Sequence, residues 1–210
     1  MEANPHQVPV SPDNPCPVLR ALVAGGQLQG ETATLRMIGD IAARLVGGAS
    51  TPDRTTGIAT FVVAMFANGP LAVLRNLFKG AQLDHLRGGP LDKKGGGSGI
   101  LDAHGQINAA ELARLDQFAS DKTDASGTTE RGLDAEALTK MLDANFARAA
   151  GRRRFFDRKL MDGELPLLLR IMGKPGGSGP YLSVAELRAL FVDRQLPERV
   201  TARLAGMRQA

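Results

Sequence analysis

The chain has 210 residues, a formal net charge of +4, 43% hydrophobic residues and a single cysteine. This length suits one domain with a real core, and the single cysteine excludes an internal disulfide. We expect a single domain over residues 1–210, with residues 1–14 as an extended N-terminal segment. Because the N-terminus lacks the basic and apolar regions of a signal peptide, we expect a reducing, cytoplasmic setting.

The single cysteine, Cys16, lies between two prolines near the N-terminus. Pro17 keeps Cys16 out of the helical region and is itself suited to the first position of a helix, while Pro15 has a fixed φ. The pattern predicts Cys16 as the N-cap of a helix through residue 23 that the glycine pair 25–26 ends. There a thiolate is favoured by backbone N–H groups and the helix dipole. The alternative is a small buried hydrophobic residue.

The rest of the chain predicts helices. Apolar residues recur every three or four positions, and β-branched or aromatic runs are scarce, so the expected fold class is all-α, a single compact helical domain. Helices are predicted over 35–45 with a stop at 47–48, over 109–119, from 135 towards 148, and over 184–192. Asn108 and Ser183, each followed three residues later by a glutamate, are predicted to cap two of them. The glycine-rich stretches 93–99 and 175–180 predict flexible loops.

Residues 57–74 carry no formal charge and approach the length of a membrane span. An Asn-Gly-Pro sequence at 68–70 interrupts this run, so we interpret it as a buried core helix followed by a turn. A peripheral membrane contact stays open as an alternative, because Arg75 and Lys79 follow closely and the pI is about 9.6.

The run Pro15-Cys16-Pro17-Val18-Leu19, followed by Leu22 and Gly26-Gln27-Leu28, resembles the proximal motif of the haem-thiolate peroxidases. This is the family of chloroperoxidase and the fungal unspecific peroxygenases, whose motif reads Pro-Cys-Pro, then Leu two residues on, and ends in Gly-x-Leu or Gly-x-Ile. The resemblance implies haem b as the cofactor. It also implies Cys16 as the axial thiolate on the haem iron, flanked by Pro15 and Pro17, and a thiolate ligand favours O–O cleavage.

Two further segments resemble the family, the turn at 98–108 and the closing helix with its Arg-x-x-Pro ending at 182–197. Gly163-Glu164 resembles the family's Gly-Glu at the start of a helix, which implies Glu164 as the acid–base group that moves a proton between the oxygens of hydrogen peroxide. Arg158, or failing that Arg154, would stabilise the developing charge.

The spacing of this pair is a departure from the family. Arg158 lies six positions before Glu164, and on a continuous helix this spacing places the two side chains about 120° apart around the axis. A loop at 161–163 would be needed to bring the two side chains onto one face.

Asp92 is the one residue that fits the family's Glu-x-Asp beside a magnesium ion, so it is the only candidate ligand for Mg²⁺. Candidates for the apolar wall of the distal pocket are Phe61, Phe66, Phe155 and Phe156.

The predicted function is therefore that of an oxidoreductase, a haem-thiolate peroxidase or peroxygenase. It would use hydrogen peroxide to oxidise or oxygenate a small organic substrate or a halide, with no nucleic acid as partner. One alternative is a non-enzymatic haem-binding protein. Another is a basic helical protein that binds a membrane or nucleic acid through residues 152–156.

A calcium loop of the EF-hand type is a third alternative. Gly105, Ile107 and Glu111 match its sixth, eighth and twelfth positions, but Ile100 and His104 stand where two of the acidic ligands belong. The three histidines, at positions 6, 85 and 104, are scattered, and we expect none of them to be a ligand.

Overall fold

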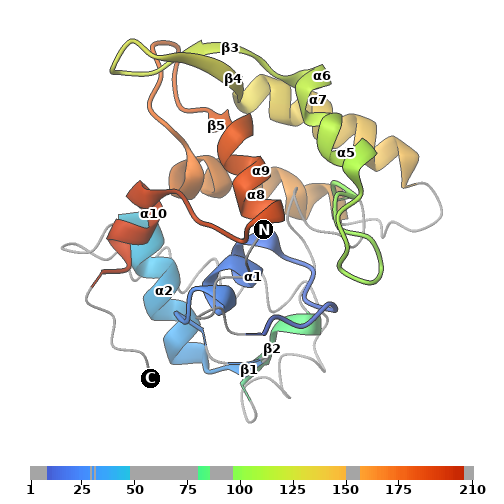
Figure 1. The fold of residues 1–210 in the computed structure, drawn as a ribbon, viewed down its shortest axis with the longest axis vertical. Helices are drawn as coiled ribbons and strands as arrows, with labels where there is room; N and C mark the ends of the chain where they lie inside the picture. The colour runs from blue at the N-terminus through green and yellow to red at the C-terminus, as the bar shows by residue number, and fades with distance from the viewer. Residues whose placement is uncertain are drawn as a thin grey trace. The chain divides into compact units, whose positions relative to one another are not determined.

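A computed structural model describes residues 9–28, 30, 32–47, 80–85, 97–149 and 157–205. The chain divides into two compact units (Figure 1). The first combines Met1–Leu86 with Arg194–Ala210, and the second is the intervening stretch Arg87–Asp193.

The first unit contains three described helices and a short two-stranded sheet. The elements are α1 (Pro17–Ala24), β1 (Thr32–Ala33), α2 (Leu35–Gly47), β2 (Ala81–Gln82), the 3₁₀ turn η1 (Leu83–His85) and α10 (Glu198–Arg203). Strands β1 and β2 are antiparallel, with Thr32 opposite Gln82. The buried side of α1 carries Ala21, Leu22, Val23 and Ala24, which places this helix in the core.

Two arginines join α2 to α10. Arg203 donates to the carbonyl oxygen of Leu45 at 2.8 Å, and Arg44 donates to that of Ala205 at 3.3 Å. Each guanidinium therefore binds a carbonyl near the C-terminal end of the other helix, where backbone carbonyls lack helical partners and a cation is favoured. These bonds connect the last described helix to the N-terminal part of the chain.

The second unit has five helices and a three-stranded sheet among its described residues. They are α5 (Ala109–Ala113), α6 (Leu115–Phe118), β3 (Ser120–Thr123), β4 (Thr129–Leu133), α7 (Ala135–Arg148), α8 (Asp157–Met172), β5 (Leu182–Ser183) and α9 (Val184–Val192). The sheet is antiparallel in the order β3-β4-β5 (Figure 1). The core of the unit includes the buried faces of α7, α8 and α9, namely Leu138, Met141, Leu142, Met161, Leu165, Leu169, Leu187, Leu190 and Phe191.

The helix starts follow local side-chain chemistry. The side-chain oxygens of Asn108, Asp134 and Ser183 accept hydrogen bonds from backbone N–H groups in the first turns of α5, α7 and α9. The predicted caps at Asn108 and Ser183 are confirmed, as are the bounds of the helix over 184–192. The N–H of Asn108 donates to the carbonyl oxygen of Ile100 at 2.7 Å, which takes the place of the return bond of a capping box.

The predicted all-α fold class is wrong, because the structure contains two antiparallel sheets beside its helices. Strands β1, β2 and β5 have two residues each, too short to show a period of two. Strand β3 has no buried residue, so its sequence shows no alternation of apolar and polar positions. The hairpin between β3 and β4 instead follows from the turn at Asp124, where Gly127 has a φ of 86°.

Three further expectations differ in detail. The predicted helix over 109–119 is two short helices that divide at Arg114. The helix expected to begin at Gly163 extends from at least Asp157, so Gly163 lies inside α8. The predicted loop at 175–180 is a turn whose Gly176 pairs with Asp124.

The apolar segment 57–74 lies outside the described residues, as do residues 93–96 of the first glycine-rich stretch. Within the part of the chain that the structure describes, no helix is long and apolar enough to cross a membrane.

Candidate functional site

Cys16 occupies the N-cap of α1, as its neighbours predict. Its backbone is extended, with φ −94° and ψ 119°, and Pro17 is the first helical residue. The side chain is half-buried and makes no capping hydrogen bond to α1. Gly25 follows the helix, and Gly26 takes a φ of 73°, so the predicted stop is confirmed. The sulfur therefore lies at the start of a helix, between the buried prolines Pro15 and Pro17.

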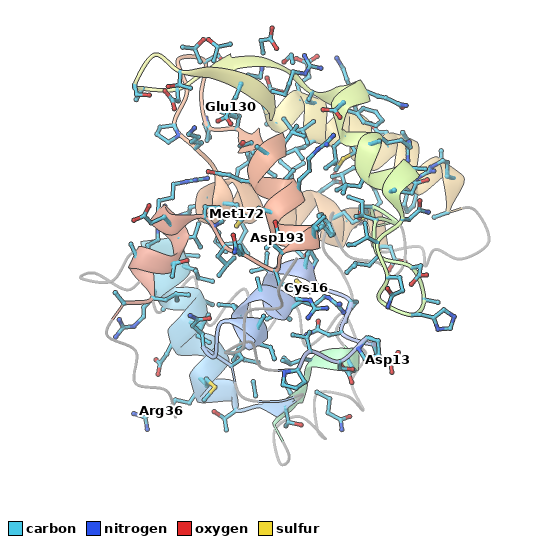
Figure 2. All side chains as sticks on the ribbon, viewed as in Figure 1. Asp13, Cys16, Arg36, Glu130, Met172 and Asp193 are labelled. Carbon is cyan, nitrogen blue, oxygen red and sulfur yellow. The ribbon has the colours of Figure 1, made fainter. Side chains whose placement is uncertain are left out.

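Hydrogen bonds fix the backbone of Cys16 on both sides. Its N–H donates to Oδ1 of Asn14 at 3.2 Å, and its carbonyl oxygen accepts from the N–H of Arg20 at 3.0 Å. The Arg20 guanidinium turns back to donate to the carbonyl oxygens of Ser11, at 3.0 Å, and of Asn14, at 3.4 Å. Ser11 in turn donates to Asp84 at 3.0 Å. Figure 2 shows Cys16 on the N-terminal part of the ribbon.

Arg20 and Asn14 were not among the residues predicted for the site. Arg20 is 4% exposed and Asn14 is 2% exposed, and burial lowers the pKa of the Arg20 guanidinium. A signal was present in the sequence, since Arg20 is the only charged residue in an otherwise apolar helix, four positions after Cys16. A charged residue in that position indicates a buried, partnered side chain.

Glu164 and Arg158 both lie on α8, in the second unit. The helix is continuous through residues 161–163, so the loop that could bring the pair together is not formed. Arg158 pairs instead with Asp143 and Asp162, and the carboxylate of Asp162 lies at 3.0 Å. Glu164 is half-buried and lies two residues before Pro166, which interrupts the helical hydrogen bonds. Arg158 therefore forms ion pairs with carboxylates on α7 and α8.

Cys16 belongs to the first unit and Glu164 to the second. Other residues predicted for the site fall outside the described residues. They are the Mg²⁺ candidate Asp92, the alternative Arg154 and the rest of the basic run 152–156, and the wall candidates Phe61, Phe66, Phe155 and Phe156. Of the histidines, His104 is exposed, and His85 lies in η1.

The possible calcium loop before α5 uses its acidic groups for other contacts. Oδ1 of Asp102 accepts the N–H groups of His104, at 2.8 Å, and Gln106, at 2.9 Å. Oδ1 of Asn108 caps α5. Over the described residues, no group of three or more His, Cys, Asp or Glu side chains could hold a metal ion, so the expectation of a metal site of this kind is not supported.

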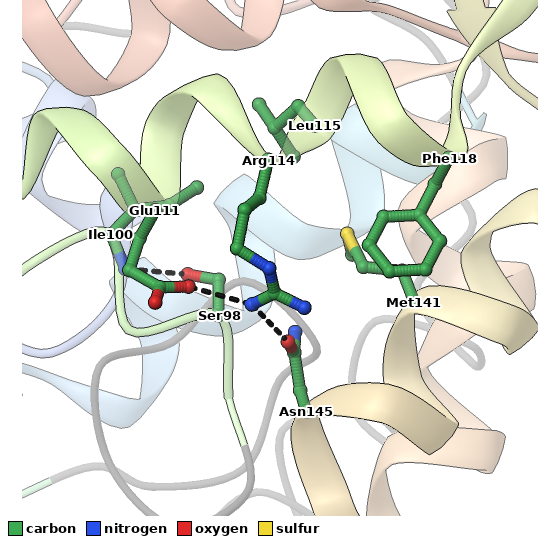
Figure 3. A pocket seen from close by; sticks show the side chains of 8 residues that line it. All are labelled: Ser98, Ile100, Glu111, Arg114, Leu115, Phe118, Met141 and Asn145. Atoms are coloured by element: carbon green, nitrogen blue, oxygen red, sulfur yellow. Dashed lines mark hydrogen bonds and ion pairs between the residues drawn. The ribbon is translucent and has the colours of Figure 1, made fainter. Parts of the chain in front are cut away.

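Glu111, the twelfth residue of that loop, faces guanidinium groups. Its carboxylate binds Arg114 at 2.7 Å (Figure 3). It also binds Arg148 at 2.7 and 2.8 Å. The hydrogen bond from Arg148, together with Arg114, lowers the pKa of Glu111 to about 2. Arg114 also donates to the buried Asn145 at 3.2 Å and lies 5.6 Å from the centre of the Phe118 ring. Here side-chain cations take the position that a calcium ion would occupy beside this glutamate.

A buried polar network connects the strands of the second unit, and the sequence did not predict it. Oε1 of Glu130 accepts from Lys174 at 2.7 Å and from the hydroxyl of Tyr181 at 2.9 Å, while Oε2 accepts from Ser183 at 2.6 Å. Burial and the carboxylate of Glu130 raise the pKa of Tyr181 to about 12. Because Tyr181 and Ser183 are buried while Glu130 and Lys174 are half-buried, the network stabilises the sheet from its interior outward.

Comparison with models of protein families, with curated protein sequences and with solved structures finds no match to this chain.

Proposed function

We propose that the chain is a haem-thiolate protein of the peroxidase type, in which Cys16 is the axial ligand of the iron. The observation that supports the proposal is the start of α1, where the single cysteine is held at an extended N-cap between two prolines. A helix N-terminus favours the thiolate over the thiol, because backbone N–H groups and the helix dipole stabilise negative charge there.

The residues at this helix start fit the group. The donor is a sulfur that is half-buried, is not used to cap α1, and belongs to a cysteine whose backbone is hydrogen-bonded on both sides. The prolines on both sides of this cysteine are buried. When bound, haem supplies an iron at which peroxide is activated, and a thiolate ligand favours O–O cleavage.

Glu164 is the proposed acid–base residue. In this role its carboxylate takes a proton from one oxygen of hydrogen peroxide and returns it to the other oxygen, which then leaves as water. The half-buried position on α8 supports such a role, because it leaves the carboxylate partly open to a small reactant. We leave Arg158 out of this step, since it pairs with two carboxylates and lies about 120° from Glu164 around the helix.

The test is the carbon monoxide difference spectrum of the full chain after it is loaded with haem and reduced. We expect a Soret band shifted far to the red, as thiolate ligation produces. Cys16→Ala should lose that band while it keeps the helical content of the parent chain. A band at the histidine-ligated position in the parent chain, or an unchanged spectrum in Cys16→Ala, would overturn the assignment of Cys16.

A further inference from the structure

We propose that Arg20 and Asn14 are positioning residues that fix the direction of the Cys16 side chain at the start of α1. This inference rests on the proposed function, in which that sulfur binds iron. Neither residue is part of the proximal motif by which the chain resembles the haem-thiolate peroxidases.

A closed ring of three hydrogen bonds holds the backbone of Cys16. Cys16 donates to the side chain of Asn14, and Arg20 donates through its backbone to Cys16. The Arg20 guanidinium then closes the ring at the carbonyl oxygen of Asn14. The peptide groups before and after Cys16 are thereby held in one arrangement, and the bond from the Arg20 N–H group to the Cys16 carbonyl oxygen is the first helical hydrogen bond of α1.

The two prolines do not determine the direction of the Cys16 side chain. Pro15 and Pro17 have fixed φ angles of their own, but neither fixes the φ or the χ1 of Cys16. Side-chain rotamers depend on φ and ψ, so a backbone free to move would let the sulfur sample several directions. The Asn14 side chain and the Arg20 backbone restrict these angles from the two ends of the residue.

The side chains that hold Cys16 are themselves buried. Arg20 is 4% exposed and Asn14 is 2% exposed. A buried guanidinium requires hydrogen-bond acceptors in definite directions, which it finds in the carbonyl oxygens of Ser11 and Asn14. An apolar side chain would fill the same volume without this requirement, so the charge at position 20 selects one conformation of the segment 11–16.

The experiment compares Arg20→Gln, Arg20→Lys and Asn14→Ala with the matched control Arg36→Gln, which removes an exposed arginine from the same unit. Two readouts are made on the protein without haem, by nuclear magnetic resonance. They are the exchange rate of the Cys16 amide and the three-bond couplings that report its χ1. The third readout is the share of thiolate-type Soret band in the reduced, carbon monoxide-bound protein after haem is added.

In Arg20→Gln we expect the Cys16 amide to exchange at least about tenfold faster, the scale of one charge-assisted hydrogen bond, although Arg20 does not touch that N–H group. The χ1 couplings should change from those of one rotamer to an average in Arg20→Gln and Asn14→Ala. Both variants should bind haem with a smaller share of the thiolate-type band. Arg20→Lys should restore part of each effect, and Arg36→Gln should match the parent chain.

The inference would be overturned if the χ1 couplings of Cys16 still reported one rotamer in Arg20→Gln and Asn14→Ala, and if the Cys16 amide of Arg20→Gln exchanged at the parental rate. If Arg20→Gln does not fold, the couplings and spectrum of Asn14→Ala decide, because that variant removes no charge. A parent chain without a thiolate-type band contradicts the proposed function alone, since the two readouts without haem still test whether Arg20 and Asn14 hold Cys16.

Discussion

Arg148 and Glu111 form a two-pronged ion pair, with nitrogen–oxygen distances of 2.7 and 2.8 Å, that joins the last residue of α7 to the first turn of α5. The hydrogen bond from Arg148 is the largest cause of the lowered pKa of Glu111. A carboxyl whose pKa is lower in the folded chain than in the unfolded chain stabilises the fold above its unfolded pKa. That stabilisation is lost as the pH falls towards about 2.

We therefore expect Glu111→Gln to lower the free energy of unfolding by about 1–2 kcal/mol at neutral pH. The difference from the parent chain should shrink as the pH falls below about 4 and should vanish only below the folded pKa of about 2, where both chains lack the charge. Urea unfolding at a series of pH values measures it. Glu136→Gln is the control, because its pair with Lys140 is exposed to solvent. A difference that stays constant down to the lowest pH contradicts the prediction.

The same substitution at two glycines should have opposite effects. A Cβ at Gly132 would overlap the Tyr181 ring, so Gly132→Ala should destabilise the chain by about 1–3 kcal/mol. Gly163 lies within α8 with open space around it, so Gly163→Ala should stabilise the chain by about 0.5–1 kcal/mol through helix propensity. Thermal unfolding measures the stability of both variants. If both changes in stability had the same sign, the prediction would be contradicted.

Tyr181 is the only tyrosine in a chain without tryptophan, so its ionisation can be followed by ultraviolet absorbance. We expect it to titrate at about 12 in the folded chain and near the ordinary value of about 10 in denaturant. Since the folded pKa is the higher one, stability should fall as the pH rises from about 10 to 12. Glu130→Gln should bring the folded value down, and an ordinary value in the parent chain would contradict the buried network.

Glu164→Gln should keep haem binding but slow peroxide consumption by about a hundredfold or more, because an amide cannot carry the proton. Stopped-flow mixing of the haem-loaded chain with hydrogen peroxide measures this rate. Glu136→Gln, an exposed change on α7 in the same unit, should react at the parental rate. Parental reactivity in Glu164→Gln would remove that residue from the proposed step.

Helix starts and stops could be predicted because they depend on a few neighbouring residues. Cys16 with Pro17 begins α1, Asn108 begins α5, and Ser183 begins α9, each through local chemistry. The division between α5 and α6 at Arg114 could not be predicted in this way. The side chain of Arg114 binds Asn145, which is 31 residues away in sequence, so its surroundings depend on tertiary structure.

The sheets and the buried charges were missed for the same reason. Strand β5 consists of Leu182 and Ser183, and its partner β4 lies about fifty residues earlier in the chain. The carboxylate of Glu130 meets the side chains of Lys174, Tyr181 and Ser183 only when these strands pair. In the candidate site, Cys16 was recognisable from its prolines, whereas the role of Arg20 depends on where its guanidinium turns.

The bond from Arg203 to Leu45 spans 158 residues of sequence, and it has a consequence for the order of folding during synthesis. The whole of the second unit leaves the ribosome before α10, which belongs to the first. Residues 87–193 can thus fold while the N-terminal unit is still incomplete, the reverse of the usual order. Until α10 leaves the ribosome, the hydrogen bonds that Arg203 and Arg44 make between α2 and α10 cannot form.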